Sequence, residues 1–195
     1  MLKRFVERKK RLLVTEQSAF FLMPLVLLPL LIEYYLFNDY KSFFLTHKDE
    51  VVLINVAYIV LARFLMLDSA VYIFSRSKHH VHLALIQIVL LYLEVTLITI
   101  FYYATLFYLF DPFTLFHLNS DFSAQTLSLI KKHDFVLSLY ISTVTFTTLG
   151  SGDWIPQTMP AMIAVVSEVI LGVVQGGVFV AIVIYAHQSK LNNKN

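Results

Sequence analysis

Seven residues in the C-terminal half of the chain have the types and spacing of a segment that binds ions through its backbone. They read TTLGSGD. Glycine at alternate positions, Gly150 and Gly152, lets successive carbonyl groups face one way, because glycine adopts the required backbone angles without a steric penalty. A ring of such segments would replace the hydration shell of an ion. The candidate ion-binding residues are Thr147, Thr148, Leu149, Gly150, Ser151, Gly152 and Asp153.

The residues before this segment predict a short helix that positions it. Asp134 is a good N-cap for a helix over residues 135–146. This apolar stretch is too short to cross a bilayer, so we expect it to enter the membrane and stop partway. The C-terminal end of the helix would then point inward, where the partial negative charge of the helix dipole favours a cation.

The composition of the whole chain is that of a membrane protein. Of the 195 residues, 58% are hydrophobic and 14% are charged, against about 45–50% and 25% in soluble domains. The mean hydropathy is +0.71. A soluble catalytic domain, a nucleic-acid module or a phosphate-binding loop would not fit in what remains. The chain has no cysteine, which excludes disulfides, thiol catalysis and cysteine-ligated metals.

Four apolar stretches predict an all-α membrane protein with four transmembrane helices and a re-entrant helix and loop. They lie at about 18–37, 51–74, 83–110 and 160–187. We divide the chain into a basic N-terminal segment (1–17), a peripheral two-helix unit (18–82), a unit that contains the re-entrant loop (83–187) and a short tail (188–195).

The distribution of basic residues predicts that both termini are cytoplasmic in the cell membrane. Ten of the fifteen Lys and Arg residues fall on the side of the termini and four on the other side, and Arg63 lies within a span. The basic N-terminal segment would lie along anionic lipids of the inner leaflet. We expect no nucleic-acid partner.

Residues 147–153 resemble the filter of the potassium channel family, whose motif reads TTVGYGD. Five of the seven positions match, Leu149 replaces valine conservatively, and Ser151 stands where the family has tyrosine or phenylalanine. The resemblance covers about residues 83–187, with an outer helix, a pore helix, the filter and an inner helix. This unit would therefore be a pore domain.

The resemblance implies a passive channel, with potassium as the permeant ion and without enzymatic activity or a cofactor. Potassium would bind at Thr148, Leu149, Gly150 and Ser151, and Asp153 would hold the filter to the pore helix at the outer mouth. One filter segment per chain implies a homotetramer.

Ser151 leaves the selectivity open. The family's aromatic residue at this position packs against the pore helix and fixes the filter diameter, and a serine cannot span the same gap. Two alternatives follow: a weakly selective monovalent cation channel, and a non-conducting membrane subunit that retains a degenerate filter.

The last apolar stretch contains residues for which packing and gating roles both stay open. Gly172 is either a hinge or a site of close helix packing. The other small and apolar residues of the same helix would line a cavity. The predicted cavity-lining or hinge residues are Gly172, Val173, Gly176, Gly177, Val180 and Ile184.

Charged residues within the spans predict structural contacts. Arg63 is expected to pair with Glu94 on the next helix. A single arginine does not make a voltage sensor. Glu168 lies off the cavity-lining face, where we expect a packing or subunit contact.

Overall fold

The computed structural model describes residues 26–37, 39–76, 85–118, 128, 130, 132–150 and 152–192. The predictions for the basic segment 1–17, the start of the first apolar stretch and Ser151 lie outside these residues.

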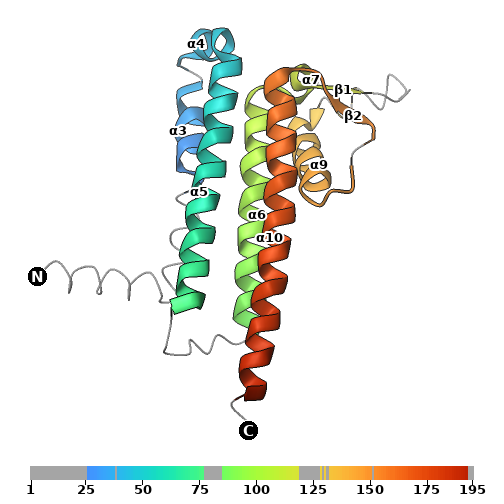
Figure 1. Ribbon diagram of the computed structural model, residues 1–195. Coiled ribbons are helices and arrows are strands. Elements are labelled where there is room, and N and C mark those ends of the chain that lie inside the picture. Colours follow the sequence, from blue (N-terminus) through green and yellow to red (C-terminus); the bar gives the residue numbers. More distant parts are fainter. Residues whose placement is uncertain are drawn as a thin grey trace, which may run out of the picture.

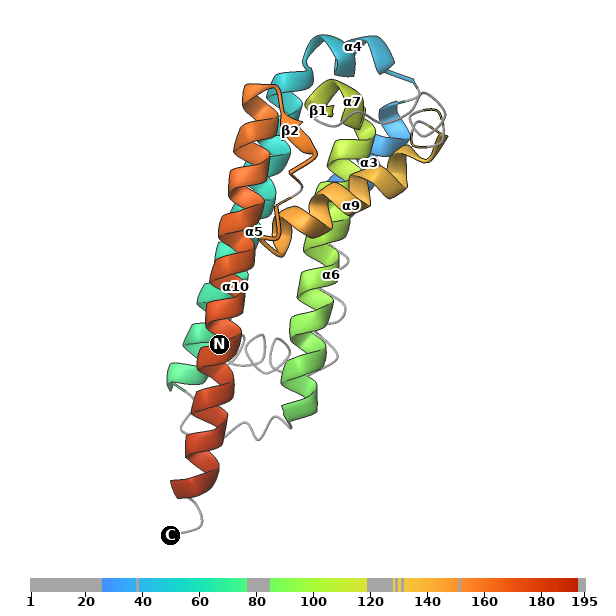
Figure 2. The same ribbon diagram turned by 90° about the vertical axis from the view of Figure 1, so that its right-hand side faces the viewer.

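The described chain is mostly helical, with one small two-stranded sheet (Figure 1). Three long helices run side by side, and the short elements gather at one end of them (Figures 1 and 2). In chain order the elements are α3 (Leu28–Phe37), α4 (Lys41–Thr46), α5 (Lys48–Arg76), α6 (Leu85–Leu109), α7 (Pro112–Leu115), β1 (Phe116–Leu118), α9 (Asp134–Phe146), β2 (Trp154–Pro156) and α10 (Met159–Asn192).

Among the described residues, two helices are long and apolar enough to cross a membrane. They are α6, over Tyr92–Leu109, and α10, over Met159–Ile184. Helix α5 has 29 residues, which confirms a helix at the second apolar stretch. For the first stretch the structure describes the ten residues of α3. The four-span count therefore stays a prediction.

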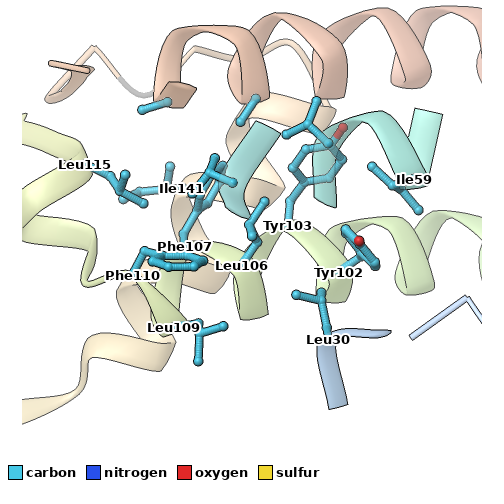
Figure 3. Close-up of a cluster of buried hydrophobic side chains, with 14 of the residues drawn as sticks. Leu30, Ile59, Tyr102, Tyr103, Leu106, Phe107, Leu109, Phe110, Leu115 and Ile141 are labelled. Atoms are coloured by element: carbon cyan, nitrogen blue, oxygen red, sulfur yellow. The ribbon is translucent and has the colours of Figure 1, made fainter. Parts of the chain in front are cut away.

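Helix α6 lies at the centre of the packing, against α3, α9 and α10. Its last turns carry large side chains with no exposed surface: Tyr102, Tyr103, Leu106 and Phe107. Figure 3 shows these residues in one cluster with Leu30 of α3, Ile59 of α5 and Ile141 of α9. The buried cluster thus joins the peripheral helices to the part of the chain that carries residues 147–153.

Polar side chains also attach the peripheral helices to α6. Asn55 of α5 donates to Glu33 Oε2 of α3 (2.7 Å), and Tyr102 of α6 donates to Asn55 Oδ1 (2.9 Å). Asn55 and Tyr102 are buried, so these hydrogen bonds satisfy groups that water does not reach.

Arg63 of α5 is buried against α6. Its guanidinium donates to the carbonyl of Val95 (2.8 Å) and to the hydroxyl of Thr99. Both acceptors are on α6, the helix that carries Glu94. An ion pair between Arg63 and Glu94 stays a prediction.

Helix α10 has one buried face and one exposed face. Its buried residues recur at helical spacing and pack against α5, α6 and α9: Ala161, Ala164, Glu168, Leu171 and Gln175. The opposite face is apolar and more than half exposed at Val166, Val173, Val180 and Ile184. A single chain therefore leaves an apolar stripe of α10 uncovered.

Candidate functional site

Helix α9 extends obliquely from the end of the molecule that carries the short elements and stops beside α10 (Figure 2). Its boundaries confirm the predicted short helix, with one correction. His133 is the N-cap and makes no side-chain capping bond, whereas Asp134 is the first helical residue. Asp134 still places an acidic group in the first turn, which the helix dipole favours.

One face of α9 is buried against α6 and α10 and includes three small polar residues, Ser138, Ser142 and Thr145. Small side chains let helices approach closely in an apolar environment. This face fixes where α9 ends, and therefore where residues 147–153 begin.

Three alternate residues in the described part of the segment have left-handed backbone angles. The φ angles of Thr148, Gly150 and Gly152 are +58°, +72° and +52°. Gly150 and Gly152 therefore take angles that glycine adopts without a steric penalty. Thr148 was not expected there, because a β-branched residue rarely takes a positive φ. Alternate left-handed residues orient neighbouring peptide groups toward one side, which gives the segment a row of polar backbone groups.

The start of this segment is tied to the end of α9. The N–H of Thr148 donates to the carbonyl of Thr145 (3.0 Å), and the N–H groups of Leu149 and Gly150 both reach the carbonyl of Val144 (3.0 and 3.4 Å). The backbone N–H groups of the first residues therefore point back to α9.

The side chains of the described part of the segment are exposed on the single chain. Leu149 is 77% exposed, and no atom lies within 4 Å of a Cβ built on Gly150 or Gly152. Asp153 is also exposed, and no hydrogen bond joins it to α9 within the described chain. The attachment expected through Asp153 is thus not made between these residues of one chain.

The chain after Asp153 is held by a two-stranded sheet that the sequence did not predict. Strand β2 pairs antiparallel with β1, so that Leu118 lies opposite Trp154 and His117 opposite Ile155. Trp154 is buried, and its ring packs edge-on against Phe113 at a centroid distance of 5.6 Å.

Glu168 is a fully buried residue of α10 that faces α9. The hydroxyl of Ser142 in α9 lies within hydrogen-bond distance of Glu168 Oε1 and, at 2.9 Å, of the carbonyl of Ile100 in α6. A second polar contact joins the hydroxyls of Tyr103 and Ser167 at 2.7 Å. The expected packing contact of Glu168 therefore lies within one chain and connects three helices.

Gly172 is a site of close packing between α10 and the end of α9. A Cβ at this position would lie 2.3 Å from the carbonyl oxygen of Phe146. This finding supports the packing role of Gly172, and a hinge at this position stays a prediction.

The remaining predicted cavity residues lie on open surface of α10. No atom comes within 4 Å of a Cβ built on Gly176 or Gly177. Val173, Val180 and Ile184 are 60%, 54% and 52% exposed. The structure therefore leaves all five free to face a space beyond the single chain.

The described part of the segment thus runs from the end of α9, which packs against α10, to the β1–β2 sheet. Sequence reasoning missed Ser142, which joins α9 to α6 and α10, and Gln157, whose side-chain nitrogen lies 3.1 Å from the carbonyl oxygens of Phe113 and Thr114. The serine spacing on the short apolar helix was the available signal for a contact face, and no local pattern indicated Gln157.

Comparison with known proteins identifies this part of the chain. A family model described as "Ion channel" matches residues 95–188, which begin within α6 and end within α10. No curated protein and no solved structure matches the chain. The match fits the resemblance to potassium channels, and residues 95–188 are therefore a membrane domain of the ion channel family.

Proposed function

We propose that this protein is a homotetrameric channel that conducts potassium ions passively across the cell membrane. Each chain would contribute α6, α9, residues 147–153 and α10 to one central pore, and α3 and α5 would form a peripheral unit with two further spans. The observation that carries the proposal is the alternating left-handed backbone at Thr148, Gly150 and Gly152, directly after a helix that ends beside α10.

The geometry supports potassium binding by backbone carbonyl groups. The carbonyl groups of Leu149, Gly150 and Ser151, with the carbonyl and hydroxyl of Thr148, would replace water around the ion. The C-terminal end of α9 would add the partial negative charge of its dipole.

The exposed apolar stripe of α10 supports assembly from several chains. Val166, Val173, Val180 and Ile184 of α10 are more than half exposed within one chain, whereas Tyr102, Tyr103, Leu106 and Phe107 of α6 have no exposed surface. The exposed surface of α10 is therefore available both for contacts with neighbouring subunits and for lining a cavity. The cavity face would include Val173, Gly176, Gly177, Val180 and Ile184.

Ion flux from purified protein in liposomes tests the function. We expect wild-type protein to pass potassium and Gly150→Ala to abolish the flux, because alanine is strained at a φ of +72°. Leu61→Ala is the control, since Leu61 is a 61% exposed residue of α5 outside the proposed pore. Folded wild-type protein without flux would favour a non-conducting subunit, and normal flux in Gly150→Ala would exclude Gly150 from the pathway.

Selectivity and assembly need separate measurements. Reversal potentials in mixed potassium and sodium gradients distinguish a potassium channel from the alternative, a weakly selective cation channel. The mass of the complex in detergent should correspond to four chains, and tags on both termini should be accessible from the cytoplasm alone. A stable monomer or an external terminus would contradict the proposed pore.

A further inference from the structure

The far end of the filter leads at once into structure that is tied to the end of α6. Strand β2 begins at Trp154, directly after Asp153, and pairs with β1. On the other side, β1 follows α7 without a gap, and Phe110 and Asp111 alone separate α7 from α6. The side chain of Asp111 caps α7 by accepting from the N–H of Phe113 (3.0 Å). The filter end and the α6 end are therefore joined by a short, ordered connection.

Gln157 strengthens this connection. Its side-chain Nε2 lies 3.1 Å from the carbonyl oxygens of Phe113 and Thr114 and 3.4 Å from that of Phe116, and its backbone N–H donates to Leu115 (3.0 Å). The last carbonyl groups of a helix lack partners within the helix, so the end of α7 needs donors from elsewhere. A carboxamide nitrogen carries two N–H donors and supplies them here.

The hydrogen bonds of Gln157 matter because the sheet itself is small. Each strand has three residues. The last residue of β2 is Pro156, which has no backbone N–H to donate to the sheet. We call β1, β2, Gln157 and the C-terminal end of α7 the β1–β2 clip.

The clip is anchored in the hydrophobic core. Phe116 is 2% exposed, and its ring packs edge-on against Phe107 of α6 at a centroid distance of 4.9 Å. Trp154 is 5% exposed on the other strand. Movement of the filter end would therefore disturb buried aromatic contacts with α6.

We infer that the β1–β2 clip holds the far end of the filter in place and that Gln157 is a positioning residue for ion selectivity. The inference rests on the proposed function. Ser151 lacks the ring that braces this end in the family, and Asp153 is exposed without a bond to α9 in the described chain. The clip takes over this bracing from a different direction, through the outer helix instead of the pore helix.

Two glutamine variants test the role of Gln157. Gln157→Met keeps a long, unbranched side chain and removes both donors. Gln175→Met is the matched control, because it removes the same two donors at a site away from the clip. Gln175 Nε2 donates to Thr96 Oγ1 (2.8 Å) and to the carbonyl of Tyr92 (3.3 Å), and these bonds join α10 to α6.

The readout is the potassium-to-sodium permeability ratio, measured from reversal potentials in planar bilayers. We expect Gln157→Met to lower the ratio by at least about threefold, a change on the scale of one hydrogen bond. Gln175→Met should leave it unchanged. A wild-type ratio in Gln157→Met, or an equal fall in Gln175→Met, would overturn the inference.

A reversible cross-link separates bracing from a folding defect. The chain has no cysteine, and His117 and Ile155 lie opposite each other in the clip. Directly opposed residues of an antiparallel pair have Cα atoms about 4.5–5.5 Å apart, which a disulfide spans. His117→Cys and Ile155→Cys can therefore be added to Gln157→Met and oxidised.

The oxidised triple variant should regain the wild-type ratio, and reduction in the same bilayer should lower it again. This measurement also covers the case in which Gln157→Met alone does not assemble, because the triple variant is purified oxidised and reduced afterwards. A permeability ratio that does not change on reduction would overturn the inference about the clip and leave the proposed channel function intact. Absence of potassium flux in folded wild-type protein would overturn the proposed function, and the inference with it.

Discussion

Gly172→Ala tests how tightly α10 packs against the end of α9. The added Cβ would lie 2.3 Å from the carbonyl oxygen of Phe146 and 3.3 Å from its carbonyl carbon. Favourable contacts between heavy atoms begin at about 3.5 Å, so one helix must move by about 1 Å to accept the methyl group. Phe146 is the last residue of α9 and directly precedes Thr147, so the displacement would reach the filter.

The expected loss of stability follows from two opposing effects. Overpacking a well-packed site costs about 1–3 kcal/mol. Replacing glycine by alanine within a helix raises the stability by about 1 kcal/mol, because alanine has the higher helix propensity. Gly176→Ala gains the same helix propensity without a clash, since no atom lies within 4 Å of its added Cβ. Gly172→Ala should therefore be less stable than Gly176→Ala by about 1–3 kcal/mol.

Thermal and denaturant unfolding of the two variants in the same detergent measures this difference, with potassium flux recorded in parallel. Equal stability of the two variants would refute the reasoning that the contact with Phe146 is rigid. Reduced flux in Gly172→Ala at unchanged stability would instead favour a hinge at this position.

Three further substitutions have definite expected outcomes. Glu168→Gln keeps a group that can hydrogen-bond to Ser142, so unfolding in detergent should give a stability within about 1 kcal/mol of wild type, and a larger loss would show that the carboxyl group has another role. Tyr102→Phe leaves Asn55 Oδ1 without its 2.9 Å donor and should lower the stability by about 1–2 kcal/mol with potassium flux unchanged; lost flux would show that the peripheral helices act on the pore. Ser151→Tyr should raise the potassium-to-sodium permeability ratio by restoring a ring behind the filter, and an unaltered, already high ratio would show that the serine costs no selectivity.

The long helices and α9 were predictable from the sequence because each is an apolar stretch with a polar boundary, whereas the short helices α4 and α7 were not predicted. The structure begins α6 at Leu85 and ends it at Leu109, close to the predicted 83–110, and it ends α9 at Phe146 as expected. The N-cap at His133 instead of Asp134 is a difference of one residue, which is the usual uncertainty at helix ends. The left-handed glycines were predictable too, because glycine is the residue that takes a positive φ without a steric penalty.

The contacts that hold the filter were not predictable from local patterns. Strands of three residues are too short to show an alternating pattern, and β1 and β2 are far apart in the sequence. The pairing of Glu168 with Ser142 depends on how α10 and α9 are rotated about their axes, which periodicity restricts to a face and not to a partner. The left-handed Thr148 contradicts its intrinsic preference and follows from the hydrogen bonds that bind the start of the segment to α9.

The length of α10 beyond Gly172 has a mechanical consequence. Gly172 lies against Phe146 at the end of α9, and α10 continues without interruption from there to Asn192. These twenty residues extend about 30 Å at 1.5 Å per residue, so a rotation of about 10° around Gly172 would move the far end by about 5 Å. A force applied near Asn192 would therefore act with a long arm on the contact between Gly172 and Phe146, directly before residues 147–153.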